Sequence, residues 1–145
     1  MSNFKYRLLM HNHLAMVLGY SVCSETINIP SEINHEGVIY RVTSIGCSAF
    51  DDCCSLTSIV IPDGVTSIGS SAFEHCSSLT SIVIPDSVTS IGEAAFMGCD
   101  SLESITFNGT KMQWNSIELG IEWNCEIPAQ IVRCTDGNVK IEECW

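Results

Sequence analysis

The sequence predicts a solenoid whose class is α/β leaning to mainly β, with parallel β ladders, short helical turns and capping hairpins at both ends. Three observations predict it. A 23-residue segment is repeated almost letter for letter, its apolar positions recur in register, and turn residues separate short β-branched runs. Self-similarity at a fixed period of this length is typical of proteins built from stacked coils.

The repeat itself is the strongest signal. Residues 56–78 read LTSIVIPDGVTSIGSSAFEHCSS, and residues 79–101 follow directly as LTSIVIPDSVTSIGEAAFMGCDS. Residues 42–53 match the second half of this unit, and residues 102–107 begin a further copy. The apolar columns that we expect to fill the core are represented in one repeat by Leu56, Ile59, Ile61, Val65, Ile68, Ala72, Phe73 and Cys76.

Each repeat divides into recognisable local elements. The run Ser58–Ile61 is short and β-branched and ends at Pro62-Asp63, which predicts a strand followed by a turn. Val65–Gly69 predicts a second extended piece, and residues 70–76 fit one short helical turn. One such coil buries too little apolar surface to offset the ordering of its backbone, so the coils must stack.

We expect one solenoid domain over residues 1–145, with an N-terminal hairpin cap (1–25), about four repeats (26–107) and a C-terminal helix and hairpin cap (108–145). Strands are expected at Phe4–Met10 and Leu14–Tyr20 around a turn of His11, Asn12 and His13. Polar-faced caps of this kind keep the ends of a solenoid soluble.

The C-terminal cap shows two further signals. Thr110 and Gln113 form a capping box that predicts a helix through about Leu119, ended by Gly120, with Trp114 and Ile117 covering the last coil. Beyond it, Asp136-Gly137 predicts a hairpin between the expected strands Ile131–Thr135 and Asn138–Glu142.

The chain has nine cysteines, an odd number that excludes complete intramolecular pairing. Cys53, Cys76 and Cys99 share one column, about 4.8 Å apart from coil to coil. That spacing is within reach of a disulfide, but we expect buried free thiols that act as small apolar fillers. Cys47 and Cys54 align with polar residues and should be exposed. A buried thiol ladder suits a reducing or anaerobic setting, which includes the surfaces of anaerobes.

The charge pattern excludes several classes of partner. The net charge is −11, and 11 of the 17 acids lie between Asp51 and Glu126, where Lys111 is the only base. Such a surface repels phosphate backbones and anionic lipids, so neither nucleic acid nor a membrane is expected as partner. No apolar run is long enough for a membrane span. The stretch after Arg7 is interrupted by polar residues and is not expected to be a signal peptide.

Motifs typical of nucleophilic catalysis, phosphate binding and zinc binding are absent from the sequence. It contains no G-x-S-x-G, no phosphate loop and no H-E-x-x-H, so we expect no catalytic residues, no cofactor and no metal. Asp63 and Asp86 fit turns better than a calcium site, and His11 and His13 fit a solvated hairpin better than a zinc site. We expect His75 and Cys76 to point in opposite directions, which excludes a nucleophile pair.

The candidate interaction site is the outer face of the main strand ladder. By alternation against the buried isoleucines, this face should carry a flat array of small side chains: Ser58, Val60, Ser81, Val83, Ser104 and Thr106. It is either a docking face for a protein or a featureless coil surface. The second ladder should expose Thr66, Ser67, Thr89 and Ser90 in part.

The pattern Leu-Thr-Ser-Ile-x-Ile-Pro-x-x-Val-Thr-Ser-Ile-Gly-x-x-Ala-Phe-x-x-Cys resembles the BspA-like leucine-rich repeat family over residues 26–107. Phe4–Arg7 and Val17–Tyr20 resemble the family's entry segment, and Gly109–Trp114 and Cys134–Gly137 resemble a segment found after the repeats. The resemblance implies a right-handed leucine-rich-repeat solenoid with parallel sheets. It also implies an extracellular or cell-surface location, because members are often surface proteins of host-associated microbes and some are adhesins.

Two functional hypotheses follow. The first is a non-catalytic, adhesin-like interaction module that binds a host or microbial protein through the exposed ladder. The second is an intracellular or structural scaffold repeat protein without an adhesive role. The sequence does not identify the partner protein or the oligomeric state.

Overall fold

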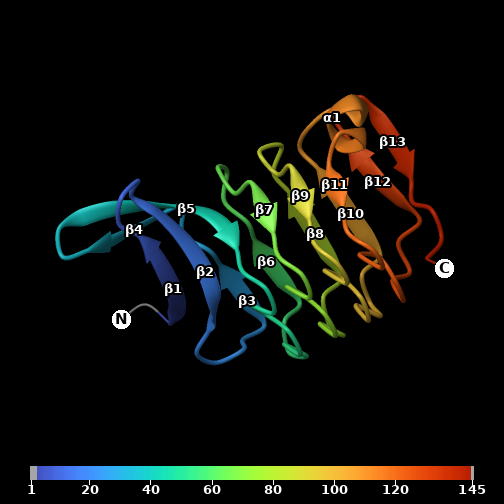
Figure 1. Ribbon diagram of the computed structural model, residues 1–145. Coiled ribbons are helices and arrows are strands. Elements are labelled where there is room, and N and C mark those ends of the chain that lie inside the picture. The colour runs from blue at the N-terminus through green and yellow to red at the C-terminus, as the bar shows by residue number, and fades with distance from the viewer. Residues whose placement is uncertain (1–2, 145) are drawn as a thin grey trace.

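The computed structural model describes residues 3–144 and shows coils stacked side by side, with the two termini at opposite ends of the stack (Figure 1). Its one helix within this range is α1 (Lys111–Asn115). The strands are β1 (Phe4–Leu9), β2 (Leu14–Tyr20), β3 (Thr26–Asn28), β4 (Glu32–His35), β5 (Val38–Ile45), β6 (Ser58–Val60), β7 (Ser67–Ile68), β8 (Ser81–Ile84), β9 (Ser90–Ile91), β10 (Ser104–Phe107), β11 (Glu118–Leu119), β12 (Ile131–Cys134) and β13 (Gly137–Lys140).

The strands form two sheets on different sides of the stack. Sheet A follows the order β1-β2-β5-β7-β9-β11, with β4 attached to β5, and sheet B follows the order β13-β12-β10-β8-β6-β3. The stacked rungs pair in parallel, whereas the hairpins β1–β2, β4–β5 and β12–β13 are antiparallel. Parallel ladders joined coil by coil confirm the predicted solenoid.

The register of the ladders follows the repeat period. Val60 pairs with Val83, Ile82 pairs with Ile105, and Ser67 pairs with Ser90. Each pair is separated by 23 residues in the sequence. Equivalent side chains therefore stack directly above one another, and each apolar position of the repeat becomes a continuous column.

A third side of the stack is held by hydrogen bonds between turns rather than by strands. The amide of Phe50 donates to the carbonyl of Ala72 at 2.8 Å, and the amide of Phe73 donates to that of Ala95 at 2.8 Å. Ser71 and His75 have positive φ angles of 55° and 57°. Left-handed residues interrupt a helix, so residues 70–76 form a series of tight turns in place of a continuous helical turn.

The predicted core columns are all buried. The rings of Phe50, Phe73 and Phe96 stack nearly parallel, with centroids 5.4 and 5.3 Å apart. Every other predicted column is less than a tenth exposed in each coil. At about 1.5–3 kcal/mol for each large side chain that is fully buried, these columns supply the main stabilisation of the stack.

The N-terminal cap matches the expected hairpin and also extends the solenoid. β1 and β2 pair through a tight turn, and β2 pairs in parallel with β5 as a rung of sheet A. The inserted loop before the first full repeat forms a second hairpin, in which Glu32 lies opposite Arg41.

The C-terminal cap confirms the capping box and corrects the helix length. The amide of Gln113 donates to Thr110 Oγ1 at 3.2 Å, and the amide of Thr110 donates to Gln113 Oε1 at 2.8 Å. The helix ends at Asn115, before the expected Leu119, because Glu118–Leu119 pairs with β9 as a rung of sheet A. Trp114 and Ile117 are buried as predicted, and β12 continues sheet B before turning into β13.

The cysteines follow the prediction in part. Cys47 and Cys54 are exposed, and Cys76 and Cys99 are buried free thiols. The expectation of a free thiol was wrong for Cys53, which forms a disulfide with Cys23 across a Cα–Cα distance of 5.5 Å. Cys23 comes from the segment after β2, which the 23-residue period does not cover. A second disulfide joins Cys125 and Cys144.

Candidate functional site

The outer face of sheet B carries the predicted array, and we call it the sheet-B face. Val60 and Val83 are 56% and 47% exposed, and Val83 pairs with Thr106 in the next rung. Ser81 is exposed and lies beside the half-buried Ser104. Ser58 is half-buried, two residues before Val60 on the same face. The structure therefore brings all six predicted residues together.

The row formed by Val60, Val83 and Thr106 extends further than the sequence suggested. Asn28 precedes Val60 in the same register, and Arg133 follows Thr106 at the other end. Both side chains are exposed. Neither residue was predicted, because β3 and β12 lie outside the two well-matched repeats. The alternation of Ile27 and Ile29 around Asn28 was the available signal for that residue. Arg133 places a positive charge at the end of an otherwise uncharged row.

The second ladder holds a different polar pattern. Thr66 and Thr89 are exposed, and Ser67 and Ser90 are half-buried, as expected. The hydroxyl of Thr66 donates to the carbonyl of Thr43, and that of Thr89 donates to the carbonyl of Thr66, both at 3.2 Å. These hydroxyls are used to link neighbouring coils, which leaves fewer free groups for a partner than the sheet-B face has.

One acidic cluster was not predicted. Asp51, Asp52 and His75 each place one ligand atom within 4.8 Å of the others, and all three side chains are exposed. His75 Nδ1 lies 3.5 Å from Asp52 Oδ1 and 3.9 Å from Glu74 Oε1. The pKa of Asp51 is raised, first by its partial burial and next by the nearby carboxylates of Asp52 and Glu74, whereas His75 lowers it. The cluster therefore joins exposed side chains of two neighbouring coils.

The remaining predicted polar residues stay separate from that cluster. Asp63 and Asp86 are exposed in the turns after the sheet-B strands. His13 lies in the β1–β2 turn, with its ring 5.8 Å from that of Tyr40. His75 is exposed and the adjacent Cys76 is buried, as expected for side chains that point in opposite directions.

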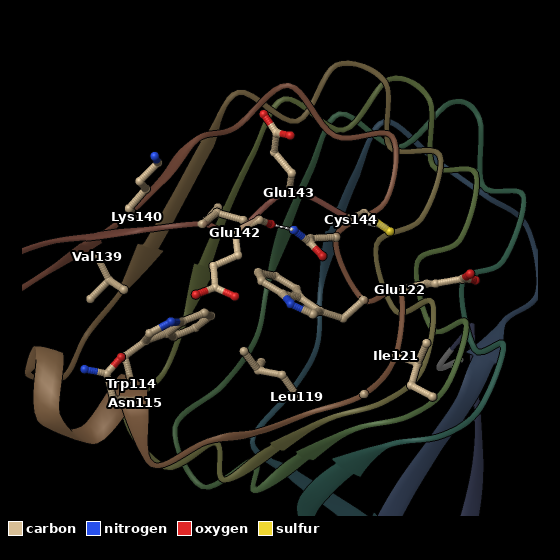
Figure 2. A pocket seen from close by; sticks show the side chains of 14 residues that line it. Trp114, Asn115, Leu119, Ile121, Glu122, Val139, Lys140, Glu142, Glu143 and Cys144 are labelled. Carbon is tan, nitrogen blue, oxygen red and sulfur yellow. Dashed lines mark hydrogen bonds between the residues drawn. The ribbon is translucent and has the colours of Figure 1, made fainter.

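A groove that the sequence analysis did not identify opens at the C-terminal end. It has a volume of about 530 Å³ and lies between the last coil and the segment after β13. Figure 2 shows the side chains of Trp114, Leu119, Ile121 and Glu142 around it. The available signal was Ile121, an apolar residue at the outward position that Ser70 and Glu93 occupy in earlier coils.

No helix in the described range is long and apolar enough to cross a membrane.

Comparison with solved structures shows the same fold in bacterial proteins. A leucine-rich repeat protein from Bacteroides capillosus is 27% identical with a TM-score of 0.77, and the match covers 92% of this chain and 95% of that one. One from Bacteroides ovatus is 30% identical with a TM-score of 0.77, and the match covers 92% of this chain and 36% of that one.

A leucine-rich cell surface protein from Faecalibacterium prausnitzii shares the fold at 24% identity and a TM-score of 0.60, over 91% of this chain and 43% of that one. No curated protein matches the chain. The family model described as "BspA type Leucine rich repeat region (6 copies)" matches residues 23–129, which include all the repeats. On this match, supported by the parallel ladders, the chain belongs to the BspA-type leucine-rich repeat family.

Proposed function

We propose that this chain is a non-catalytic interaction module that binds a partner protein through the sheet-B face. The observation that carries the proposal is the row formed by Val60 and Val83, two exposed apolar side chains on adjacent rungs. Rigid strands hold this row in a fixed geometry, so a partner does not have to order a flexible surface. Leucine-rich repeat proteins commonly use such extended repeated surfaces for binding.

We also propose that the module works outside the cell, as an adhesin-like surface protein. Two features support this location. The disulfides Cys23–Cys53 and Cys125–Cys144 are typical of proteins in oxidising environments. In addition, one protein of the same fold is described as a cell surface protein.

The test is a binding comparison between two matched double variants. Val60→Gln/Val83→Gln removes the apolar row without adding charge, and Val22→Gln/Ile39→Gln removes two exposed apolar side chains elsewhere. Each variant is immobilised and exposed to host extracellular matrix extract and to lysate of the source cell, at low and high salt. We expect salt-resistant capture of one matrix protein, lost at least tenfold only in the Val60/Val83 variant.

Other outcomes separate the alternatives. Capture only from the lysate contradicts the extracellular proposal and supports an intracellular scaffold. Equal capture by both variants contradicts the role of the sheet-B face. Capture that disappears at high salt indicates non-specific attraction to the acidic surface, and the solenoid then serves as a structural spacer.

A further inference from the structure

The hydrogen-bonded turns on the third side of the stack end at the last coil, where three backbone amides have no acceptor among residues 3–144. In each earlier coil, alternate amides donate to the next coil: Ala94 donates to Ile121, Phe96 to Trp123 and Gly98 to Cys125, at 2.9–3.0 Å. By the same register, the corresponding donors of the last coil are the amides of Glu122, Asn124 and Glu126. None of residues 3–144 accepts a hydrogen bond from these three amides.

The left-handed geometry of the turn is nevertheless retained. The φ angles of Glu122 and Glu126 are 59° and 61°, close to the 53° of Ala94 and the 73° of Gly98 in the coil before. The three free amides therefore keep the orientation that the earlier coils use for pairing. This end of the molecule is an open hydrogen-bonding edge.

Sheet A is open at the same end. β11 is its last strand. In the rung before it, the carbonyl of Ile91 accepts a hydrogen bond from the amide of Gly120 at 2.7 Å. The carbonyl of Leu119 holds the equivalent position in β11. Leu119 is 40% exposed and Ile121 is 75% exposed, so apolar side chains flank the free edge. Exposed edges with free backbone groups are templates for an added strand.

The groove gives this edge a defined shape. Its walls are the last coil and the segment after β13, which a hydrogen bond from Asn124 Nδ2 to the carbonyl of Glu142, at 2.8 Å, ties together (Figure 2). The disulfide between Cys125 and Cys144 fixes the same two walls. Trp114 and Trp123 lie at the base of the groove, and only 4% and 8% of their surface is exposed.

The charge of the groove selects the partner. Glu122, Glu142 and Glu143 line it and are exposed, whereas Lys140 is its one basic lining residue within the described range. Three carboxylates against one ammonium group give the groove a net negative charge, and such a groove concentrates cationic ligands. An acidic rim around an apolar floor is complementary to a strand with alternating basic and apolar side chains.

We propose that this groove binds an extended cationic peptide segment of a partner protein, which adds as a strand along Leu119–Asn124. Carbonyls of the peptide accept from the free amides of Glu122 and Asn124, and one of its amides donates to Leu119. Apolar side chains face the tryptophans, and lysines or arginines face the glutamates. A segment of about six residues spans this edge at about 3.3 Å per residue.

The test measures binding of three synthetic hexapeptides by calorimetry at 50 and 300 mM salt. The first alternates lysine and valine, the second replaces lysine by glutamate, and the third is the lysine peptide with every backbone amide nitrogen methylated. We expect micromolar-range binding of the first peptide, at least tenfold weaker binding of the N-methylated one, and none of the acidic one. N-methylation removes backbone donors without changing charge, so equal binding of the first and third peptides would overturn the proposal.

Variants locate the site. Glu122→Gln/Glu142→Gln/Glu143→Gln is expected to weaken binding of the lysine peptide at least tenfold. The matched control Glu25→Gln/Glu32→Gln/Glu36→Gln changes the same number of exposed carboxylates near the other end and should stay within twofold. Equal losses in both triple variants would mean general attraction to an acidic protein and would refute the site. Val60→Gln/Val83→Gln should bind the peptide normally, which separates this groove from the sheet-B face.

Discussion

Single side chains in this molecule take their properties from their position in the stack. The thiol of Cys76 donates to the carbonyl of Phe50 at 3.1 Å, and that of Cys99 donates to Phe73 at 3.0 Å. The neighbouring thiol of Cys99, together with burial, raises the pKa of Cys76 far above its ordinary range. Since the thiolate is the reactive form, Cys76 is an inert filler of the core, and Cys99 is shielded from reagents by its burial.

The accessibility of the thiols tests this interpretation. Under native conditions at pH 8, we expect iodoacetamide to label Cys47 and Cys54 rapidly and the half-buried Cys134 more slowly, because burial raises the pKa of Cys134. Cys76 and Cys99 should react only in denaturant, and the four disulfide cysteines only after reduction. Peptide mass spectrometry assigns each site. Labelling of Cys76 at the rate of Cys54 would contradict the buried ladder.

The carboxylate of Asp51 gives a prediction about pH. Folding raises the pKa of this group through partial burial and its acidic neighbours. The folded state therefore prefers the protonated form, so ionisation above that pKa lowers stability and the loss disappears as the pH falls. Asp51→Asn should raise the urea midpoint at pH 7 and leave it unchanged at pH 3. Asp63→Asn, in an exposed turn, is the control, and an equal gain in both variants would refute the assignment.

At the scale of the element, the coils are limited by how closely their backbones approach. A Cβ atom built on Gly69 would lie 2.6 Å from the amide nitrogen of Cys47, which is backbone and cannot move aside. Gly92 and Gly120 occupy the same corner in the next coils and meet the backbone below them in the same way. The glycine of each repeat is therefore required by coil stacking, since only a residue without a side chain fits between two backbones.

Gly69→Ala should consequently destabilise the protein by about 1–3 kcal/mol, the usual cost of overpacking. Ser70→Ala, at the adjacent exposed position, should change the free energy of unfolding by less than about 0.5 kcal/mol. Urea denaturation followed by circular dichroism measures both. A loss for Gly69→Ala no larger than for Ser70→Ala would mean that the coils separate easily at this corner.

At the scale of the whole molecule, the two ends of the stack are fixed in different ways. Each coil contacts only its neighbours, so stability is close to a sum of coil and interface terms. The terminal coils have one neighbour each and are the weakest part of such a stack. The disulfide Cys23–Cys53 lies near the first full repeat and Cys125–Cys144 lies at the last coil. Both covalent links are placed where the stack is otherwise weakest.

Reduction of the disulfides should therefore loosen the ends first. The loops that they close span 30 and 19 residues, and loop-closure entropy assigns each about 3–4 kcal/mol. With reductant, we expect a lower urea midpoint and faster hydrogen exchange in β3 and β12, with little early change in the central strands β7 and β8. Uniform acceleration along the chain would indicate a single cooperative unit in which the disulfides have no local role.

The repeating part of this protein can be predicted from its amino-acid sequence. The buried columns represented by Leu56 and Phe73 and the repeated sheet-B strands follow from local patterns that recur at a fixed period. The hairpin at Asp136-Gly137 follows from its own turn residues. The six residues of the candidate sheet-B face follow from the same alternation. Their positions are predictable because each depends on residues close by in the sequence.

Tertiary structure alone decided the features that depend on distant segments. Glu118–Leu119 forms a strand where local preference indicated a helix, because β9 offers it a backbone to pair with. Cys53 pairs with Cys23 because the chain after β2 returns beside it. The C-terminal groove exists because the segment after β13 folds back along the last coil. Contacts between segments far apart in the chain leave no local pattern, so only the folded stack reveals them.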